Sequence, residues 1–298
     1  MVSIIIPTYK RSDVLVRAIE SCLNQTMKDI EIIVVDDNQP DSEYRKITEQ
    51  MMERYNDNEK VIYLKHEKNM RGSAARNTGI KASHGDYITF LDDDDVLDST
   101  KIEKQVEVLS QKGQEYGVVC CGVKVCDADS GKQMKCIQPN KEGDVQFDML
   151  KLRMGMGTGS NPLFRRSVVE ETGFFDTSFL RQQDTEYMIR VLRNYKLAVV
   201  PEILITKYES GHPNRPAADV YLDIQKHFMN TFKDDISRYS EDEQNEIYRN
   251  NWHQICIVAV DARDWKIAKQ CYKKANDYMK YSLKMKLGIL RHILNNRY

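Results

Sequence analysis

The sequence predicts an α/β fold in which a mostly parallel sheet is covered by helices on both faces. Over the first part of the chain, short β-branched runs alternate with segments whose apolar residues recur at helical spacing. The predicted strands are apolar nearly throughout, which is typical of parallel strands buried on both faces. Three of them end in polar or acidic residues, which suits loops at the carboxyl edge of such a sheet.

The elements follow one another in a regular order. The predicted strands cover residues 2–6, 30–35, 61–64, 87–91, 117–123, 197–200 and 203–205. Helices are expected to begin near residues 12, 42, 71 and 101. Pro7 is expected to end the first strand, and Asp129-Ser130-Gly131 predicts a hairpin. A glycine-dense segment, residues 155–160, predicts a mobile loop or a close backbone approach to a ligand.

Length and composition indicate one large domain with an appended helical part. The chain has 298 residues, of which 41% are hydrophobic and 30% charged. We expect an α/β domain at residues 1–212 and a C-terminal helical region at residues 213–298. The net charge of -1 gives no general attraction to nucleic acid. Seven cysteines without a CxxC pattern, and no sign of a secretory signal or membrane span, favour a protein of the reducing cytoplasm.

Four consecutive carboxylates, Asp92 to Asp95, follow the strand Tyr87–Leu91. A buried strand cannot hold them, so they must lie where the strand leaves the sheet. Adjacent like charges repel unless a cation or a donor-rich ligand neutralises them, and oxygen ligands of this kind suit Mg²⁺ or Mn²⁺. The alternative is a solvated acidic turn before the next helix, with Asp98 or Ser99 as its cap.

The predicted sheet brings three strand ends to one edge. Residues 7–9, Asp36-Asp37 and the acidic cluster would together offer backbone donors, a hydroxyl, an aromatic ring and several carboxylates. A nucleotide with a diphosphate and a metal ion matches this set of groups. The sequence lacks the glycine-rich motifs of P-loop and dinucleotide-binding proteins, so those interpretations lose their specific signal.

These motifs occur together in an order that resembles the family 2 glycosyltransferases, which have a GT-A (Rossmann-like) fold and use nucleotide sugars. The resemblance covers roughly residues 1–212. The matching segments are residues 2–9, 34–37, 72–80, 85–95, 164–166, 173–176 and 183–186.

The resemblance implies a role for individual positions. Asp184 corresponds to the catalytic base of an inverting transfer, and Asp92-Asp93-Asp94 corresponds to the DxD motif. The positions implied to bind the nucleotide sugar are Pro7, Thr8, Tyr9, Asp37, Arg71, Asp92 and Asp93. Those implied to bind the divalent cation, Mn²⁺ or Mg²⁺, are Asp92, Asp94 and His212.

Several of these positions also have simpler interpretations. Tyr9 could pack in the core, Arg71 could form a surface ion pair, Asp95 could cap a helix, and His212 could be an ordinary loop residue. The sequence also departs from the family pattern twice. Gln183 stands where a glutamate usually precedes the base, and the segment before Gly72 is one residue longer than usual.

The resemblance therefore implies a metal-dependent, hexosyltransferase-type enzyme. The donor would be a UDP-sugar, and the acceptor a hydroxyl of a glycan or lipid-linked molecule in surface polysaccharide synthesis. The alternatives are a non-catalytic scaffold that binds nucleotides or glycans on the same fold, and a nucleotidyltransferase, which would usually show a glycine-rich loop after the first strand.

The last segment of the chain places leucines at helical spacing among basic residues. These are Leu283, Leu287, Leu290 and Leu294, with Lys280, Lys284, Lys286 and Arg291. Such a helix could lie on the inner face of an anionic plasma membrane, or it could pack on the protein with a solvated basic face.

Overall fold

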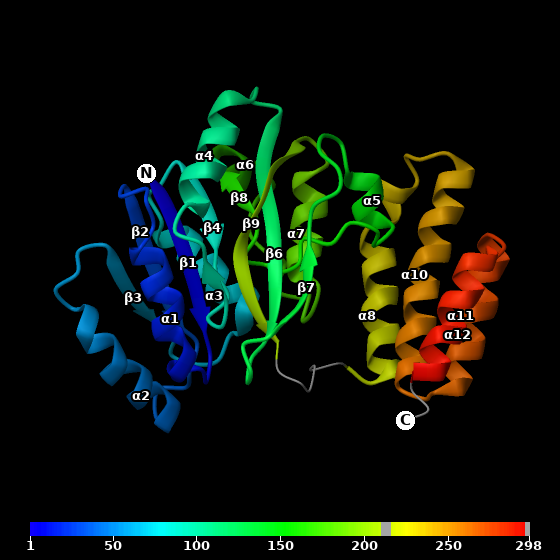
Figure 1. The fold of residues 1–298 in the computed structure, drawn as a ribbon, viewed down its shortest axis with the longest axis horizontal. Coiled ribbons are helices and arrows are strands. Elements are labelled where there is room, and N and C mark those ends of the chain that lie inside the picture. Colours follow the sequence, from blue (N-terminus) through cyan, green and yellow to red (C-terminus); the bar gives the residue numbers. More distant parts are fainter. Residues whose placement is uncertain (210–215, 296–298) are drawn as a thin grey trace. The chain divides into compact units, whose positions relative to one another are not determined.

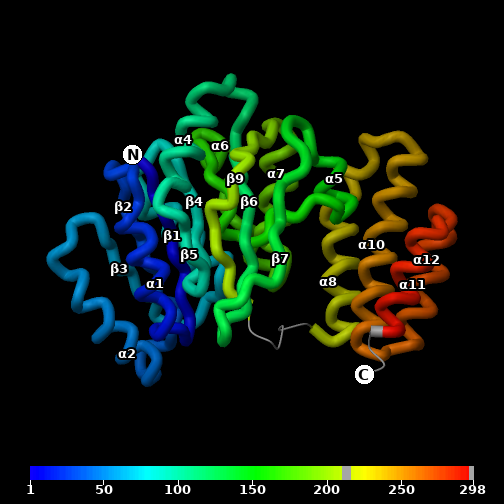
Figure 2. The backbone as a smooth tube through the Cα atoms, in the orientation of Figure 1, coloured from blue at the N-terminus to red at the C-terminus, as the bar shows by residue number. Residues whose placement is uncertain are grey.

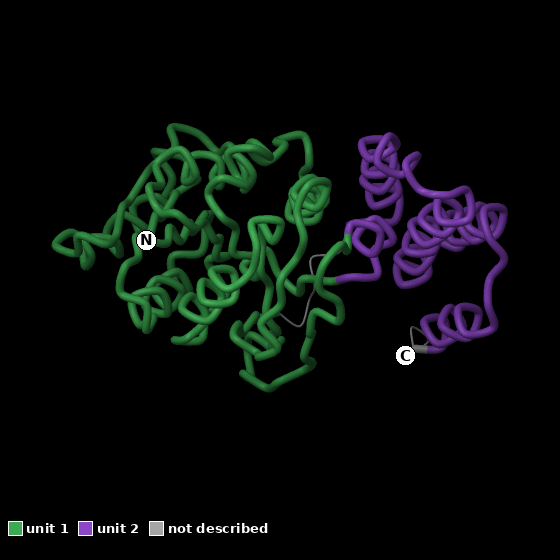
Figure 3. The backbone as a smooth tube through the Cα atoms, turned by 90° about the horizontal axis from the view of Figure 1, so that it is seen from above, with its two compact units in different colours: residues 1–145, 155–213 green, residues 146–154, 214–298 purple. Residues whose placement is uncertain are grey.

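The structure, a computed structural model, describes residues 1–209 and 216–295. It divides into two compact units (Figure 3). The first comprises residues 1–145 and 155–213, and the second comprises residues 146–154 and 214–298. The second unit thus includes residues 146–154, which lie within the range of residues 1–212 expected for the α/β domain.

The first unit contains one sheet with the strand order β3-β2-β1-β4-β8-β6-β9-β5, in which β7 also pairs with β6 (Figure 1). The strands are β1 (Val2–Thr8), β2 (Ile30–Asp36), β3 (Val61–Lys65), β4 (Tyr87–Phe90), β5 (Val96–Leu97), β6 (Tyr116–Asp127), β7 (Gln133–Ile137), β8 (Leu163–Arg165) and β9 (Lys196–Glu209). The three longest ladders, β1–β2, β2–β3 and β6–β9, are parallel. β8 runs antiparallel to both of its neighbours. The predicted α/β class is confirmed.

Helices cover both faces of the sheet, and alternate side chains of β1 pack against the helices on opposite sides. Ile4 and Ile6 join a core with apolar residues of α1 and α4. On the other side Ile5 meets α3, where a Cβ added to Gly79 would lie 2.3 Å from the Ile5 side chain, so only glycine permits this close approach. The helices of this unit are α1 (Ser12–Leu23), α2 (Glu43–Met52) with the 3₁₀ turn η1 (Glu53–Tyr55), α3 (Arg71–Ala82), α4 (Lys101–Gln111), α6 (Arg166–Thr172) and α7 (Gln183–Val191).

Two prolines do not end strands as the sequence suggested. β1 continues through Pro7, which lies opposite Val35 in the parallel ladder, and stops one residue later. β9 runs without interruption through Pro201, so the two short strands expected there are one strand. The ladder between β6 and β9 shifts register in this region, and that irregularity accommodates the proline.

The second unit is helical. It contains α5 (Gln146–Leu150), α8 (Ala218–Thr231), α9 (Lys233–Ile236), α10 (Glu241–Asp261), α11 (Trp265–Tyr278) and α12 (Leu283–Asn295) (Figure 2). It has a hydrophobic core of its own, built on Ile255, Ala259 and Cys271. A capping box between Ser240 and Glu243 begins α10. Within the described part of the chain, every helix is too short or too polar to cross a bilayer.

Candidate active site

The four carboxylates after β4 alternate between burial and exposure. The side chains of Asp92 and Asp94 are 32% and 30% exposed, whereas Asp93 and Asp95 are buried. Residues 92–95 form a turn, closed by a hydrogen bond from Asp95 N to the Asp92 carbonyl oxygen at 3.0 Å, and this turn buries two of the side chains and leaves the other two partly exposed. Asp92 and Asp94 are therefore the members of the cluster whose side chains are accessible to a ligand.

The two buried carboxylates anchor neighbouring loops. The Thr8 hydroxyl donates to Asp93 Oδ2 at 2.8 Å, which ties the end of β1 to the cluster. Asp95 Oδ2 accepts from the hydroxyls of Thr158 and Ser160 at 2.6 and 2.7 Å. Asp95 therefore holds the glycine-dense loop, residues 155–160, and is not a helix cap.

Arginines neutralise the two exposed carboxylates. Arg76 donates to Asp92 Oδ1 at 2.7 Å from α3. Arg11 forms an ion pair with Asp94 and lies 3.3 Å from Asp93. The Arg76 side chain is buried and Arg11 is half exposed, so Arg11 is the more easily displaced of the two.

Burial disfavours the charged form of Asp93, Asp94 and Asp95 in this cluster. Burial raises the pKa of Asp93 to about 6 and that of Asp95 to about 7, with the neighbouring carboxylates adding to the effect. Burial also raises the pKa of Asp94. A divalent cation would offset this charge, and the hard oxygens of Asp92 and Asp94 suit Mg²⁺ or Mn²⁺. Among the described residues, no group of three His, Cys, Asp or Glu side chains is arranged for metal binding.

Asp37 lies at the end of β2 and is fully engaged in the protein. One oxygen accepts from Met70 N and the His66 ring, and the other from Arg71 N and the Asn69 amide, at 2.7 to 2.9 Å. Four donors use the usual capacity of a carboxylate. Asp37 thus fixes the start of α3, and a nucleotide base would have to share or displace one of these donors.

The residues at the end of β1 differ in their exposure. Thr8 is buried, whereas Tyr9 is 41% exposed, which excludes core packing as the role of this ring. The Lys10 ammonium lies 5.1 Å from the centre of the Tyr9 ring. Pro7 remains within β1. Tyr9 is the member of this group with a face available for stacking.

Arg71 and Arg76 both belong to α3, but they differ in exposure and in the carboxylates that they contact. The Arg71 side chain is exposed, and its backbone N–H, not its guanidinium, contacts Asp37. Arg76 is the α3 arginine that reaches the acidic cluster. The sequence predicts Arg71 as a nucleotide-binding position and does not predict Arg76, although both residues lie in the same motif.

Asp184 lies beside the acidic cluster. A Cβ added to Gly159 would be 3.7 Å from Asp184 Cβ and 3.7 Å from Asp92 Oδ2. Arg76 Nη2 lies 3.6 Å from the same point, so the start of α7, the turn after β4 and α3 all come close to this glycine. His212, the third expected metal ligand, lies outside the described residues.

Aromatic packing positions α7. Phe175 stacks on Tyr187 of α7 with ring centres 4.1 Å apart and meets Phe90 of β4 edge to face at 5.1 Å. Asn77 of α3 exchanges two hydrogen bonds with the backbone of Phe175, at 2.8 and 2.9 Å. Phe175 thus connects three elements that carry charged residues of the site, Arg76, Asp92 and Asp184.

Comparison with known proteins gives matches over the same region. The sequence profile described as Glycosyl transferase family 2 matches residues 3–173. A protein named uncharacterized glycosyltransferase from Rickettsia prowazekii is 32% identical over 208 residues, which are 69% of this chain and 63% of that protein. One from Methanocaldococcus jannaschii is 28% identical over 225 residues, which are 74% of this chain and 73% of that protein. The chain thus spans less than two thirds of the Rickettsia relative.

Solved structures share the fold at low identity. TarS 1–349 of S. aureus in complex with UDP-GlcNAc has a TM-score of 0.69 and 13% identity, over 99% of this chain and 88% of that one. The mannosyltransferase PcManGT of Pyrobaculum calidifontis, in complex with GDP-Man and Mn²⁺, has a TM-score of 0.58 and 14% identity, over 100% of this chain and 87% of that one.

Proposed function

The chain belongs to glycosyl transferase family 2, and on that premise we propose that it transfers a sugar from a nucleoside-diphosphate donor to an acceptor hydroxyl, with inversion at the anomeric carbon. The observation that carries this proposal is that Asp92 and Asp184 both lie within 4 Å of the same point beside Gly159. Asp92 would serve the charged end of a donor, and Asp184, close by, would act as the base.

The donor would bind along the carboxyl edge of the sheet. Tyr9 has the exposed ring that a base can stack on, and Pro7 and Thr8 shape the same strand end. Asp92 and Asp94 would hold Mn²⁺ or Mg²⁺, which when bound would offset the negative charge of the diphosphate. Asp93 supports this edge through Thr8.

Charge on the departing diphosphate also needs nearby cations. Arg11, Arg76 and Lys207 surround the acidic cluster, and Arg11 is exposed enough to turn from Asp94 to a bound phosphate. Arg71, exposed at the start of α3, is a further candidate for the nucleotide. Asp37 would act on the nucleotide by holding the loop that ends at Arg71.

Asp184 would serve as the general base. Its carboxylate would take the proton of the acceptor hydroxyl as that oxygen forms a bond to the anomeric carbon, while the bond from the anomeric carbon to the diphosphate oxygen breaks. A positioned base typically contributes about 10² to 10⁴-fold in rate. Gln183, beside it, carries no charge that would disturb this carboxylate.

For the substrates, we propose a UDP-sugar donor and a glycan or lipid-linked acceptor used in surface polysaccharide synthesis, on the cytoplasmic side of the membrane. TarS binds UDP-GlcNAc and PcManGT binds GDP-Man, so both nucleotides belong in the test. Contact with the membrane would come through α12, where Leu283, Leu287, Leu290 and Leu294 are all exposed.

The experiment is a screen of UDP- and GDP-sugars by thermal shift and by donor hydrolysis, each with Mn²⁺ and with EDTA. We expect one donor to raise the melting temperature and to be hydrolysed only with the metal. If no donor stabilises the protein, the transferase proposal is wrong. Stabilisation without hydrolysis or transfer would instead favour the non-catalytic scaffold.

A further inference from the structure

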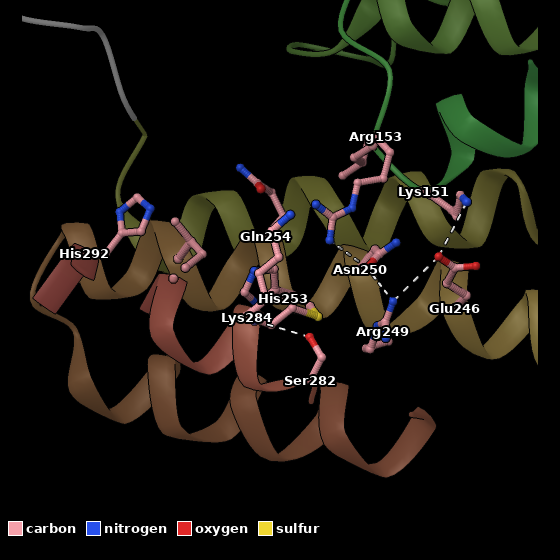
Figure 4. Close-up of a pocket in the computed structure, with 14 residues that line it drawn as sticks. Lys151, Arg153, Glu246, Arg249, Asn250, His253, Gln254, Ser282, Lys284 and His292 are labelled. Carbon is pink, nitrogen blue, oxygen red and sulfur yellow. Dashed lines mark hydrogen bonds and ion pairs between the residues drawn. The ribbon is translucent and has the colours of Figure 1, made fainter. Parts of the chain in front are cut away.

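The helical unit contains a cavity of about 670 Å³ that the proposed transfer does not use (Figure 4). Its walls come from the segment after α5, from α10, and from α12 with the residues before it. A volume of this size is in the range of small-molecule sites. All of its lining residues belong to the second unit.

The lining of this cavity is basic, although Lys151 is also paired with Asp148 and His292 with Asp261, which do not line it. Among the described residues that line it, Glu246 is the one carboxylate. It lies 3.5 Å from Lys151 and 3.7 Å from Arg249, so it partly neutralises these two. The cationic and titratable side chains of the lining are Lys151, Arg153, Arg249, Lys284, His253 and His292.

Two guanidinium groups converge on one neutral side chain. Arg153 and Arg249 each donate to Asn250 Oδ1, at 3.4 and 3.2 Å (Figure 4). Asn250 is 3% exposed. Like charges brought to a single amide oxygen repel each other, and burial lowers the pKa of Arg249, with Arg153 adding to the effect. The charge of these two arginines is therefore offset only in part, by Glu246.

Two donors at the same place have no acceptor. Neither Arg249 Nε nor Asn250 Nδ2 has a hydrogen-bond partner within the described part of the chain, although both atoms are buried. A buried donor without a partner costs free energy, which a ligand with several oxygen atoms would recover. A phosphate group supplies such oxygens, and guanidinium groups bind it with paired hydrogen bonds.

We propose that this cavity is a second binding site and that it takes a phosphate group of an anionic ligand. Arg153 and Arg249 would hold the phosphate, with Asn250 Nδ2 as a neutral donor. Lys284 would add charge from α12. The phosphate can belong to a soluble ligand or to a lipid head group, because both present the same oxygens to these donors.

The first test uses inorganic pyrophosphate on the full chain in EDTA, so that binding to the acidic cluster through a metal is excluded. We expect saturable binding by calorimetry. Arg249→Gln should weaken it about tenfold or more, since a hydrogen bond to a charged group is lost. Circular dichroism and the melting temperature check that this variant folds.

Lys284→Gln and Lys286→Gln form the matched pair. Both lysines are exposed on α12, but only Lys284 lines the cavity. The first change should weaken pyrophosphate binding several-fold, and the second should leave it unchanged. Equal effects of the two changes would mean general attraction to a basic surface and would overturn the proposal.

Vesicles distinguish the two sources of phosphate. If the ligand is a lipid head group, vesicles with phosphatidic acid should co-sediment the protein, pyrophosphate should compete, and Lys284→Gln but not Lys286→Gln should reduce binding. If pyrophosphate binds and such vesicles do not, the ligand is soluble. If neither pyrophosphate nor the vesicles bind, the proposal is overturned. All of these results are independent of whether any sugar is transferred.

Discussion

Asp92 and Asp184 both lie beside Gly159: Oδ2 of the first and Cβ of the second are each 3.7 Å from the place where residue 159 would carry a Cβ. Asp92 follows β4 and Asp184 lies in α7, so the two carboxylates are far apart in sequence. Thr158 and Ser160, on either side of the glycine, are bound to Asp95. These two hydrogen bonds therefore hold Gly159 close to both carboxylates.

Gly159→Ala should fold normally and transfer slowly. The new methyl group would meet its neighbours at ordinary van der Waals distances, but it would occupy space beside both Asp92 and Asp184. We expect kcat/KM to fall about 10- to 100-fold, as small misplacements of substrate do. Gly155→Ala is the control, because a Cβ at that position of the same loop has open space around it. Equal activity of the two variants would remove Gly159 from the site.

Asp184→Asn should separate chemistry from binding. The amide keeps the shape of the side chain but cannot accept the proton, so turnover should fall about 10² to 10⁴-fold. The donor dissociation constant, measured by calorimetry with Mn²⁺, should stay within about twofold of the wild type. Gln183→Ala, one residue earlier, should keep its turnover. Full turnover in Asp184→Asn would show that another group is the base.

Asp94→Asn and Asp95→Asn should differ although the residues are adjacent. Asp94 is partly exposed and is a proposed ligand, so its loss should weaken metal-dependent donor binding about tenfold or more. Asp95 is buried and accepts hydrogen bonds from two hydroxyls. Burial raises its pKa to about 7, so the amide of asparagine imitates the protonated form. That variant should bind the donor nearly normally. The reverse order would contradict the assignment of Asp94 as the metal ligand.

The sequence predicted the parts of the structure that depend on local pattern. Alternating β-branched runs and helical spacings predicted β1 to β4 and the helices between them, because burial on a sheet imposes those periods. It did not predict β8, a strand of three residues, since so short a segment has no periodicity and pairs only because β4 and β6 flank it.

The contacts of the site depended on tertiary structure and were less predictable. Arg76 and Arg71 share one motif, and only the turn of α3 decides which of them reaches Asp92. Asp37 was expected to face the base, but the carboxylate meets four donors from the loop before α3. Asn77 gave no sequence signal for its contact with Phe175, because the two residues belong to separate motifs.

Lys101→Met should stabilise the protein. Lys101 is fully buried, and within the described residues its ammonium has no hydrogen-bond acceptor. We expect the free energy of unfolding to rise by about 1 to 3 kcal/mol at pH 7, as measured by urea denaturation. Burial lowers the pKa of Lys101 in the folded protein below the value of 10.5 in the unfolded chain. The buried ammonium therefore destabilises the fold below pH 10.5, and this destabilisation decreases as the pH rises toward 10.5.

The control for this change lies on the same helix. Lys104 is paired with Glu202 at the surface, so Lys104→Met should change stability by less than about 1 kcal/mol. A loss of stability in Lys101→Met would mean that the ammonium has a favourable partner in solution.

The second unit should lose stability in mild acid through His253. Burial lowers the pKa of this ring to about 4, and Arg153, Arg249 and His292 add to the effect. The unfolded chain, with a pKa of 6.5, binds the proton first, so stability is complete above pH 6.5 and is lost as pH falls toward 4. His253→Gln should flatten this part of the pH profile of urea unfolding, whereas His227→Gln, at an exposed position, should not.

Saturating pyrophosphate should raise the pKa of His253, because an anion beside the two arginines favours the protonated ring, and NMR titration measures this pKa. An unchanged pKa would place the bound phosphate away from this histidine and count against the second site.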